Sequence, residues 1–101
     1  MTQFFKGKKI LVTGGAGFIG SFVVEHLVQA RGVDPADIVV PRSRDCDLRE
    51  LEHARRAVKG CQIVIHLAAQ TGGIAFSRSH PASQYYNCAL MNLHVLEAAR
   101  Q

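Results

Sequence analysis

The sequence predicts an α/β fold with a doubly wound parallel sheet, of which the chain supplies the N-terminal portion, with about four strands. Three observations lead to this prediction. Short apolar runs rich in β-branched residues alternate with segments of helical periodicity. A glycine-rich turn follows the first of these runs directly. The 101 residues are enough for one small domain, but not for the six or so strands of a complete doubly wound sheet.

The first half of the chain places a strand and a helix on either side of this turn. Residues 9–13 (Lys-Ile-Leu-Val-Thr) are typical of a strand buried on both faces of a parallel sheet. In residues 18–31 the apolar positions recur mostly three and four residues apart, which predicts a helix. Residues 33–37 then form a turn, and residues 38–40 a second buried strand that ends at Pro41.

The second half continues the alternation. The expected elements are a very short strand at 44–47, a helix at 48–59 ended by Gly60, a strand at 61–67, a loop at 68–80 and a helix from Pro81 to the C-terminus. Proline suits the first turn of a helix, because its fixed φ matches and its missing N–H has no partner there. Such an alternation implies right-handed crossovers between parallel strands. Since no linker divides the chain, we treat residues 1–101 as one domain.

Composition argues against several classes of protein. The net charge is only +4, and the basic clusters lack the broad stripe or interleaved aromatics of a nucleic-acid-binding surface. No apolar run reaches the ~18 residues of a membrane span, and the N-terminus lacks the order of a signal peptide. We therefore expect a cytoplasmic protein without nucleic-acid or membrane partners. The cysteines and histidines show no metal-ligand spacing, so we expect no metal site, and we interpret His66 as a core residue.

The glycine loop, residues 13–20 (Thr-Gly-Gly-Ala-Gly-Phe-Ile-Gly), is the most informative segment. It lies between a strand and a helix, as a dinucleotide-binding loop does. Two registers fit: glycines at 15, 17 and 20 match G-x-G-x-x-G, and glycines at 14, 17 and 20 match a wider spacing. Unpaired N–H groups at a helix N-terminus can bind a pyrophosphate if no Cβ blocks its approach. We predict that Gly14 and Gly17 supply the turn and the close approach, and that Gly20 allows close helix packing.

The residues after the second strand favour NADP over NAD. An NAD-binding fold places an acid about 20 residues beyond the loop to bind the ribose, but Val40 and Pro41 occupy that place. Arg42 and Arg44 follow, and a guanidinium can pair bidentately with a 2′-phosphate. The alternative is that both arginines are solvated loop residues.

With these residues in place, the chain resembles the extended short-chain dehydrogenase/reductase family, the group of NAD-dependent epimerases and dehydratases that act on nucleotide sugars. The resemblance rests on the glycine loop and on residues 66–69 (His-Leu-Ala-Ala), and it implies a Rossmann-like fold. It also implies that Asp47 and Leu48 contact adenine and that residues 68–69 lie beside the nicotinamide half. The expected cofactor-binding residues are Thr13, Gly14, Gly17, Phe18, Ile19, Gly20, Arg42, Arg44, Asp47, Leu48, Leu67, Ala68 and Ala69.

Within this family, the subgroup of GDP-L-fucose synthases is the more similar one. Residues 40–45 (Val-Pro-Arg-Ser-Arg-Asp) and 68–74 (Ala-Ala-Gln-Thr-Gly-Gly-Ile) look like that subgroup, whose members are NADP-dependent epimerase–reductases of a GDP-4-keto-6-deoxy sugar. The resemblance implies that Gly72 and Gly73 border the substrate site. GDP-mannose 3,5-epimerases are similar around the same glycines and prefer NAD, so an NAD-dependent nucleotide-sugar epimerase/dehydratase is an alternative.

The family's catalytic residues, a Ser or Thr with Tyr-x-x-x-Lys, have no match in the sequence. Tyr85 is followed four residues on by Ala89, and Tyr86 by Leu90. We therefore predict no catalytic residue and expect the catalytic and substrate portion to lie outside this chain. The chain alone would bind NADP(H) without catalysis, as the cofactor half of a nucleotide-sugar epimerase/reductase. The alternative is a non-catalytic dinucleotide-binding or regulatory module.

The final helix is apolar around much of its circumference, which requires burial on more than one side. In the family this helix packs on the sheet and in the helix bundle of a dimer. The resemblance therefore implies a homodimer through the last helix.

Overall fold

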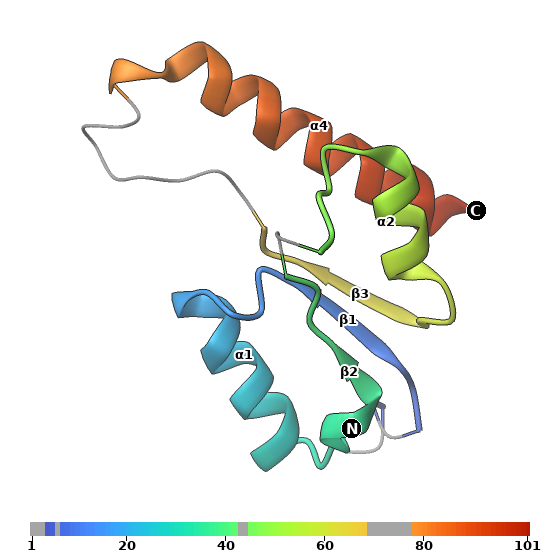
Figure 1. Ribbon diagram of the computed structural model, residues 1–101. Helices are drawn as coiled ribbons and strands as arrows, with labels where there is room; N and C mark the ends of the chain where they lie inside the picture. Colours follow the sequence, from blue (N-terminus) through green and yellow to red (C-terminus); the bar gives the residue numbers. More distant parts are fainter. Residues whose placement is uncertain (1–3, 6, 43–44, 69–77) are drawn as a thin grey trace.

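The computed structural model describes residues 4–5, 7–42, 45–68 and 78–101 (Figure 1). Its sheet has three parallel strands, β1 (Ile10–Thr13), β2 (Ile38–Val39) and β3 (Ile63–His66), in the order β2-β1-β3. The central strand β1 is completely buried, as expected of a parallel strand covered on both faces. The predicted fold class is confirmed, with three strands rather than about four in the described residues.

Helices cover both faces of the sheet. Helix α1 (Phe18–Gln29) lies on one face, whereas α2 (Leu51–Val58) and α4 (Pro81–Arg100) pack side by side on the other (Figure 1). A short 3-10 turn, η1 (Pro35–Asp37), leads into β2. Right-handed crossovers explain the arrangement: the connection from β1 to β2 lies on one face, and the connection back past β1 to β3 lies on the other. No helix in the described part of the chain is long and apolar enough to cross a membrane.

The alternation of side chains along the strands divides the core into two clusters. On the α1 face, Ile10 and Val12 of β1 pack with Leu27 and Val33. On the other face, Val64 of β3 packs against a cluster supplied by the segment before α2, by α2 and by α4. The buried members of that second cluster are Leu48, Ala54, Val95 and Ala98. By the same alternation, Thr13 and its register partner His66 face α4.

The expected short strand at 44–47 is wrong for its described residues. The N–H groups of Asp45 and Cys46 both donate to the carbonyl of Arg42, at 2.9 and 2.8 Å. This turn takes the donors that a strand would offer to its neighbour. Arg44, at the start of the expected strand, lies outside the described residues.

The helix expected at 48–59 begins later, at Leu51. The side chain of Asp47 accepts the N–H of Arg49 at 3.0 Å, and its carbonyl accepts the N–H of Glu50 at 2.9 Å. Such a local side-chain turn competes with helical hydrogen bonds. The other predicted helices and strands are confirmed, and their ends differ from the expected ones by no more than about two residues. Most of the loop expected at 68–80 lies outside the described residues, and residues 78 and 79 are helical.

Candidate functional site

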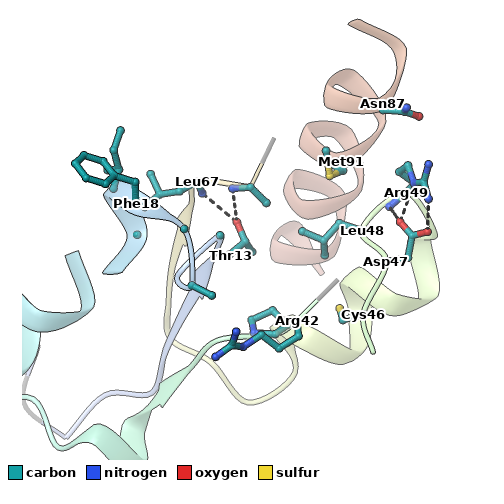
Figure 2. Close-up of a pocket in the computed structure, with 17 residues that line it drawn as sticks. Thr13, Phe18, Arg42, Cys46, Asp47, Leu48, Arg49, Leu67, Asn87 and Met91 are labelled. Carbon is teal, nitrogen blue, oxygen red and sulfur yellow. Dashed lines mark hydrogen bonds and ion pairs between the residues drawn. The ribbon is translucent and has the colours of Figure 1, made fainter. Parts of the chain in front are cut away.

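The carboxyl ends of the strands open onto a cleft of about 1180 Å³ (Figure 2). It lies beside β1, where the connection from β1 to β2 passes over one face of the sheet and the connection from β2 to β3 passes over the other. This reversal of strand order is the point at which open α/β sheets bind ligands. Every predicted cofactor-binding residue that the structure describes lines the cleft: Thr13, Gly14, Gly17, Phe18, Ile19, Gly20, Arg42, Asp47, Leu48, Leu67 and Ala68. The other predicted residues, Arg44, Ala69, Gly72 and Gly73, lie outside the described residues.

The glycine loop packs directly on the end of β3. Gly14 has a φ of +72°, a conformation that residues with a Cβ rarely adopt. A Cβ on Gly14 would lie 2.9 Å from the nitrogen of Ala68, and a Cβ on Gly20 would lie only 2.0 Å from the carbonyl oxygen of Gly14. The predicted tight packing of Gly20 is thus present, and the atoms it meets belong to the loop itself.

The loop delivers an uncapped helix end to the cleft. Gly17 is the N-cap of α1, and its own N–H donates to Gly14 at 3.0 Å. Glycine has no side chain to cap the first turn, and that turn contains no acidic residue. The first N–H groups of a helix have no intrahelical partner and carry partial positive charge. This end of α1 can therefore accept an anionic group.

Thr13 links the glycine loop to the residues that follow β3. Its side chain is completely buried. Its Oγ1 accepts the N–H groups of Leu67 and Ala68, at 3.0 and 3.1 Å (Figure 2). The loop and the end of β3 consequently form one hydrogen-bonded unit.

The acid–arginine turn, residues 46–49, forms the facing wall (Figure 2). Arg49 donates through Nε and a terminal nitrogen to the two carboxylate oxygens of Asp47, at 3.0 and 2.9 Å. These hydrogen bonds hold the pKa of Asp47 below its ordinary value, with a smaller contribution from the charge of Arg49. The turn is anchored by two histidines, because His53 Nδ1 accepts the N–H of Asp47 at 2.8 Å and His94 Nδ1 donates to the carbonyl of Leu48 at 2.9 Å.

The end of β2 carries a cation in place of an acid. Arg42 is exposed and lines the cleft just beyond Val40 and Pro41. Asp37 belongs to η1, which precedes β2 and therefore lies at the opposite end of the strand. The nearby Cys46 lines the cleft as well, and burial raises the pKa of its thiol.

Several lining residues were not among the predicted ones: Ala16, Pro41, Cys46, Arg49, Asn87 and Met91. Arg49 could have been found, since it stands two residues after the predicted Asp47. Asn87 and Met91 are four residues apart on α4 and so share one face of that helix. Nothing in the local sequence indicates that this face meets the cleft, because only the packing of α4 brings it there.

Comparison with known proteins identifies the family. The model of the family described as "NAD dependent epimerase/dehydratase family" matches residues 10–101. The chain belongs to this family. A GDP-L-fucose synthase from Azorhizobium caulinodans is 32% identical over 93 residues, which cover 90% of this chain and 28% of that protein. A GDP-mannose 3,5-epimerase from Arabidopsis thaliana is 28% identical over 110 residues, covering 91% of this chain and 27% of that protein.

Solved structures of family members share the fold. The UDP-glucose 4-epimerase of Thermus thermophilus, in complex with NAD, has a TM-score of 0.72 and 35% identity, covering 91% of this chain and 33% of that one. A GDP-L-fucose synthetase from Naegleria fowleri bound to NADP has a TM-score of 0.70 and 30% identity, covering 99% of this chain and 28% of that one. The chain thus spans about a third or less of the length of these relatives.

Proposed function

We propose that the chain binds NADP(H) in the cleft and forms the cofactor portion of a nucleotide-sugar epimerase/reductase similar to GDP-L-fucose synthase. The observation that supports this most directly is the uncapped N-terminus of α1, presented by the glycine loop at the reversal of strand order. Membership of the epimerase/dehydratase family supports the same proposal.

The pyrophosphate would bind at the start of α1. Its oxygens would accept from the N–H groups of Phe18, Ile19 and Gly20, where Gly17 leaves room for close approach. Gly14 and Thr13 would shape the loop around it. These roles agree with the dinucleotide chemistry expected of a strand–glycine loop–helix unit.

The adenine would lie between the acid–arginine turn and the end of β3. The carboxylate of Asp47 and the backbone of Leu48 would contact its edge, and hydrogen bonds from Arg49 hold the pKa of that carboxylate below its ordinary value. Leu67 and Ala68, with Ala69 after them in sequence, would continue along the cofactor toward the nicotinamide.

The positive charge of the arginines beyond β2 supports a preference for NADP. Arg42 lies at the end of β2, where an acid would bind the free ribose hydroxyls of NAD, and Arg44 follows it in sequence. The NADP-bound fucose synthetase is a related structure, which supports this choice. The NAD-bound epimerase, equally similar in fold, supports the alternative of NAD.

The activity of the whole protein is part of the proposal. Gly72 and Gly73 would lie beside a nucleotide sugar. The complete enzyme would epimerise and reduce that sugar. The chain alone would bind the cofactor without catalysis. A non-catalytic dinucleotide-binding module is the alternative, because the sequence contains no Tyr-x-x-x-Lys.

A homodimer through α4 belongs to the same proposal. Tyr85, Leu93 and Leu96 are 78%, 62% and 69% exposed on this helix, an extent of apolar exposure that favours a partner. Sedimentation equilibrium of the chain tests the idea, and a monomer at high concentration would contradict it.

Substitution of both arginines tests the NADP proposal. Arg42→Ala with Arg44→Ala removes the charge expected to pair with the 2′-phosphate. A charge-assisted hydrogen bond contributes about 1.5–3 kcal/mol, so the affinity for NADP should fall roughly 10- to 100-fold. The affinity for NAD should change little, as measured by titration calorimetry with both cofactors. Equal losses of affinity for NADP and NAD would refute the assignment of the 2′-phosphate. Arg31→Ala provides the control, because Arg31 is a half-buried arginine beyond the end of α1.

A further inference from the structure

A series of hydrogen bonds connects α4 to the glycine loop through His66. The Nε2 of His66 lies 2.8 Å from Oδ1 of Asn92 on α4. The Nδ1 of His66 lies 2.6 Å from Oγ1 of Thr13, the atom that also meets the N–H groups of Leu67 and Ala68. Neither His66 nor Asn92 lines the cleft, whereas Thr13, which His66 contacts through Nδ1, does.

The hydroxyl of Thr13 determines where the imidazole proton lies. A hydroxyl has one proton to donate and two lone pairs with which to accept. The N–H groups of Leu67 and Ala68 use both lone pairs, although that of Leu67 also reaches the carbonyl oxygen of Thr13 at 3.0 Å. The hydroxyl proton is therefore donated to Nδ1 of His66. The ring then carries its own proton on Nε2 and donates it to Asn92.

The peptide held by Thr13 is the surface on which the glycine loop packs. A Cβ on Gly14 would lie 2.9 Å from both the nitrogen of Ala68 and the carbonyl carbon of Leu67. Thr13 is fully buried, so water does not readily replace its hydroxyl as an acceptor. A shift of the Leu67–Ala68 peptide would consequently move Gly14 and the start of α1.

We propose that His66 is a positioning residue of the dinucleotide site. As the neutral tautomer protonated on Nε2, it orients the hydroxyl of Thr13, which holds the Leu67–Ala68 peptide against Gly14. The consequence for ligand binding rests on the proposed function, whereas the hydrogen-bond arrangement does not. His66 thus acquires a role that its interpretation as a core residue did not include.

The unmodified chain provides the first test, without any cofactor. Long-range ¹H–¹⁵N spectra at mildly alkaline pH distinguish the two neutral tautomers of histidine. We expect the proton of His66 on Nε2 and a slowly exchanging amide at Ala68. A proton on Nδ1 would overturn the proposal, since the Thr13 hydroxyl would then have no acceptor in this ring.

Two substitutions of His66 separate its acceptor from its bulk. His66→Asn retains an acceptor near the position of Nδ1, whereas His66→Phe retains only a ring. We expect His66→Phe to lose the exchange protection of Ala68 and to weaken NADP binding roughly tenfold, and His66→Asn to keep most of both. His26→Phe, at an exposed position of α1, controls for the added phenyl ring.

The results distinguish a failure of the His66 proposal from a failure of the proposed function. If the wild-type chain binds no NADP, the proposed function is wrong, and the tautomer and exchange data alone decide whether His66 positions the peptide. If the wild-type chain binds NADP and His66→Phe weakens that binding no more than His26→Phe does, the proposed function stands and the role of His66 is wrong.

Discussion

The two walls of the cleft are built from different parts of the chain. The glycine loop is held by backbone contacts, with Gly20 against Gly14 and Gly14 against Ala68, at distances that leave no room for a Cβ. The acid–arginine turn is held by side chains, with Arg49 on Asp47 and two histidines on its backbone. One wall is rigid because of sterics, and the other depends on pairs of polar groups.

This difference indicates what each wall tolerates. A close steric contact cannot be exchanged for water, so a single added methyl group must displace the backbone. Water competes for the charged groups of an exposed ion pair, so the pair contributes little to the free energy of unfolding. We therefore expect substitutions in the glycine loop to have large effects, and substitutions in the turn to have small ones.

The largest effect is expected from Gly20→Ala. The new Cβ would lie 2.0 Å from the carbonyl oxygen of Gly14, so the loop or the helix must move. Overpacking of this kind should lower the free energy of unfolding by about 3 kcal/mol, measured by urea denaturation, and should abolish NADP binding. Stability equal to that of the wild-type chain would show that the loop is not closed by this contact.

Gly17→Val should separate binding from folding. Gly17 has a φ of −79° and a ψ of −176°, which a β-branched residue adopts easily, and its Cβ would meet only the Gly14 oxygen at 3.3 Å. The isopropyl group would instead occupy the proposed position of the pyrophosphate. We expect at least a hundredfold loss of NADP affinity in calorimetry, equivalent to about 2.7 kcal/mol, with a loss of stability below about 1 kcal/mol. Undiminished binding would mean that the phosphates lie elsewhere.

The smallest effect is expected in the turn, from Asp47→Asn. Hydrogen bonds from Arg49 hold the pKa of Asp47 below its ordinary 3.8 in the folded chain. The ionised carboxylate therefore stabilises the fold above that value, and its contribution disappears as the pH falls through the lowered folded-state pKa. Near neutral pH, the free energy of unfolding of the wild-type chain should exceed that of Asp47→Asn by less than about 1 kcal/mol. This difference should shrink as the pH falls from about 5 to about 2.

A double-mutant cycle tests whether this small contribution to stability comes from the Asp47–Arg49 ion pair. Arg49→Ala should lose a similar amount of stability, and the double variant should lose little more, because the two residues share one interaction. Additive losses would show that Asp47 acts mainly through its bond to the N–H of Arg49 rather than through the guanidinium.

Sequence reasoning was most successful where the backbone decides the structure. The strand–glycine loop–helix unit, the parallel sheet and the final helix from Pro81 were predicted from apolar spacing and from glycine and proline chemistry. The strand, the glycine loop and the helices depend on local rules that each short segment satisfies by itself. The predicted cleft residues share one site because parallel strands place their carboxyl ends at the same edge of the sheet.

The predictions from sequence failed where a hydrogen-bonded turn or a long-range contact decides the structure. Asp47 captures the N–H of Arg49, which moves the start of α2 to Leu51, and the turn on Arg42 removes the expected strand from residues 45–47. Asn87 and Met91 enter the cleft only through the packing of α4, which is a long-range contact. Neither kind of information is present in the periodicity of a short window.

Titration calorimetry of the wild-type chain with NADP and, separately, with NAD tests the central claim most directly. Circular dichroism first establishes that the chain is folded. We expect saturable binding of both cofactors at one site, with NADP bound at least tenfold more tightly because of the positive charge beyond β2. A folded chain that binds neither cofactor would contradict the assignment of the cleft as a dinucleotide site.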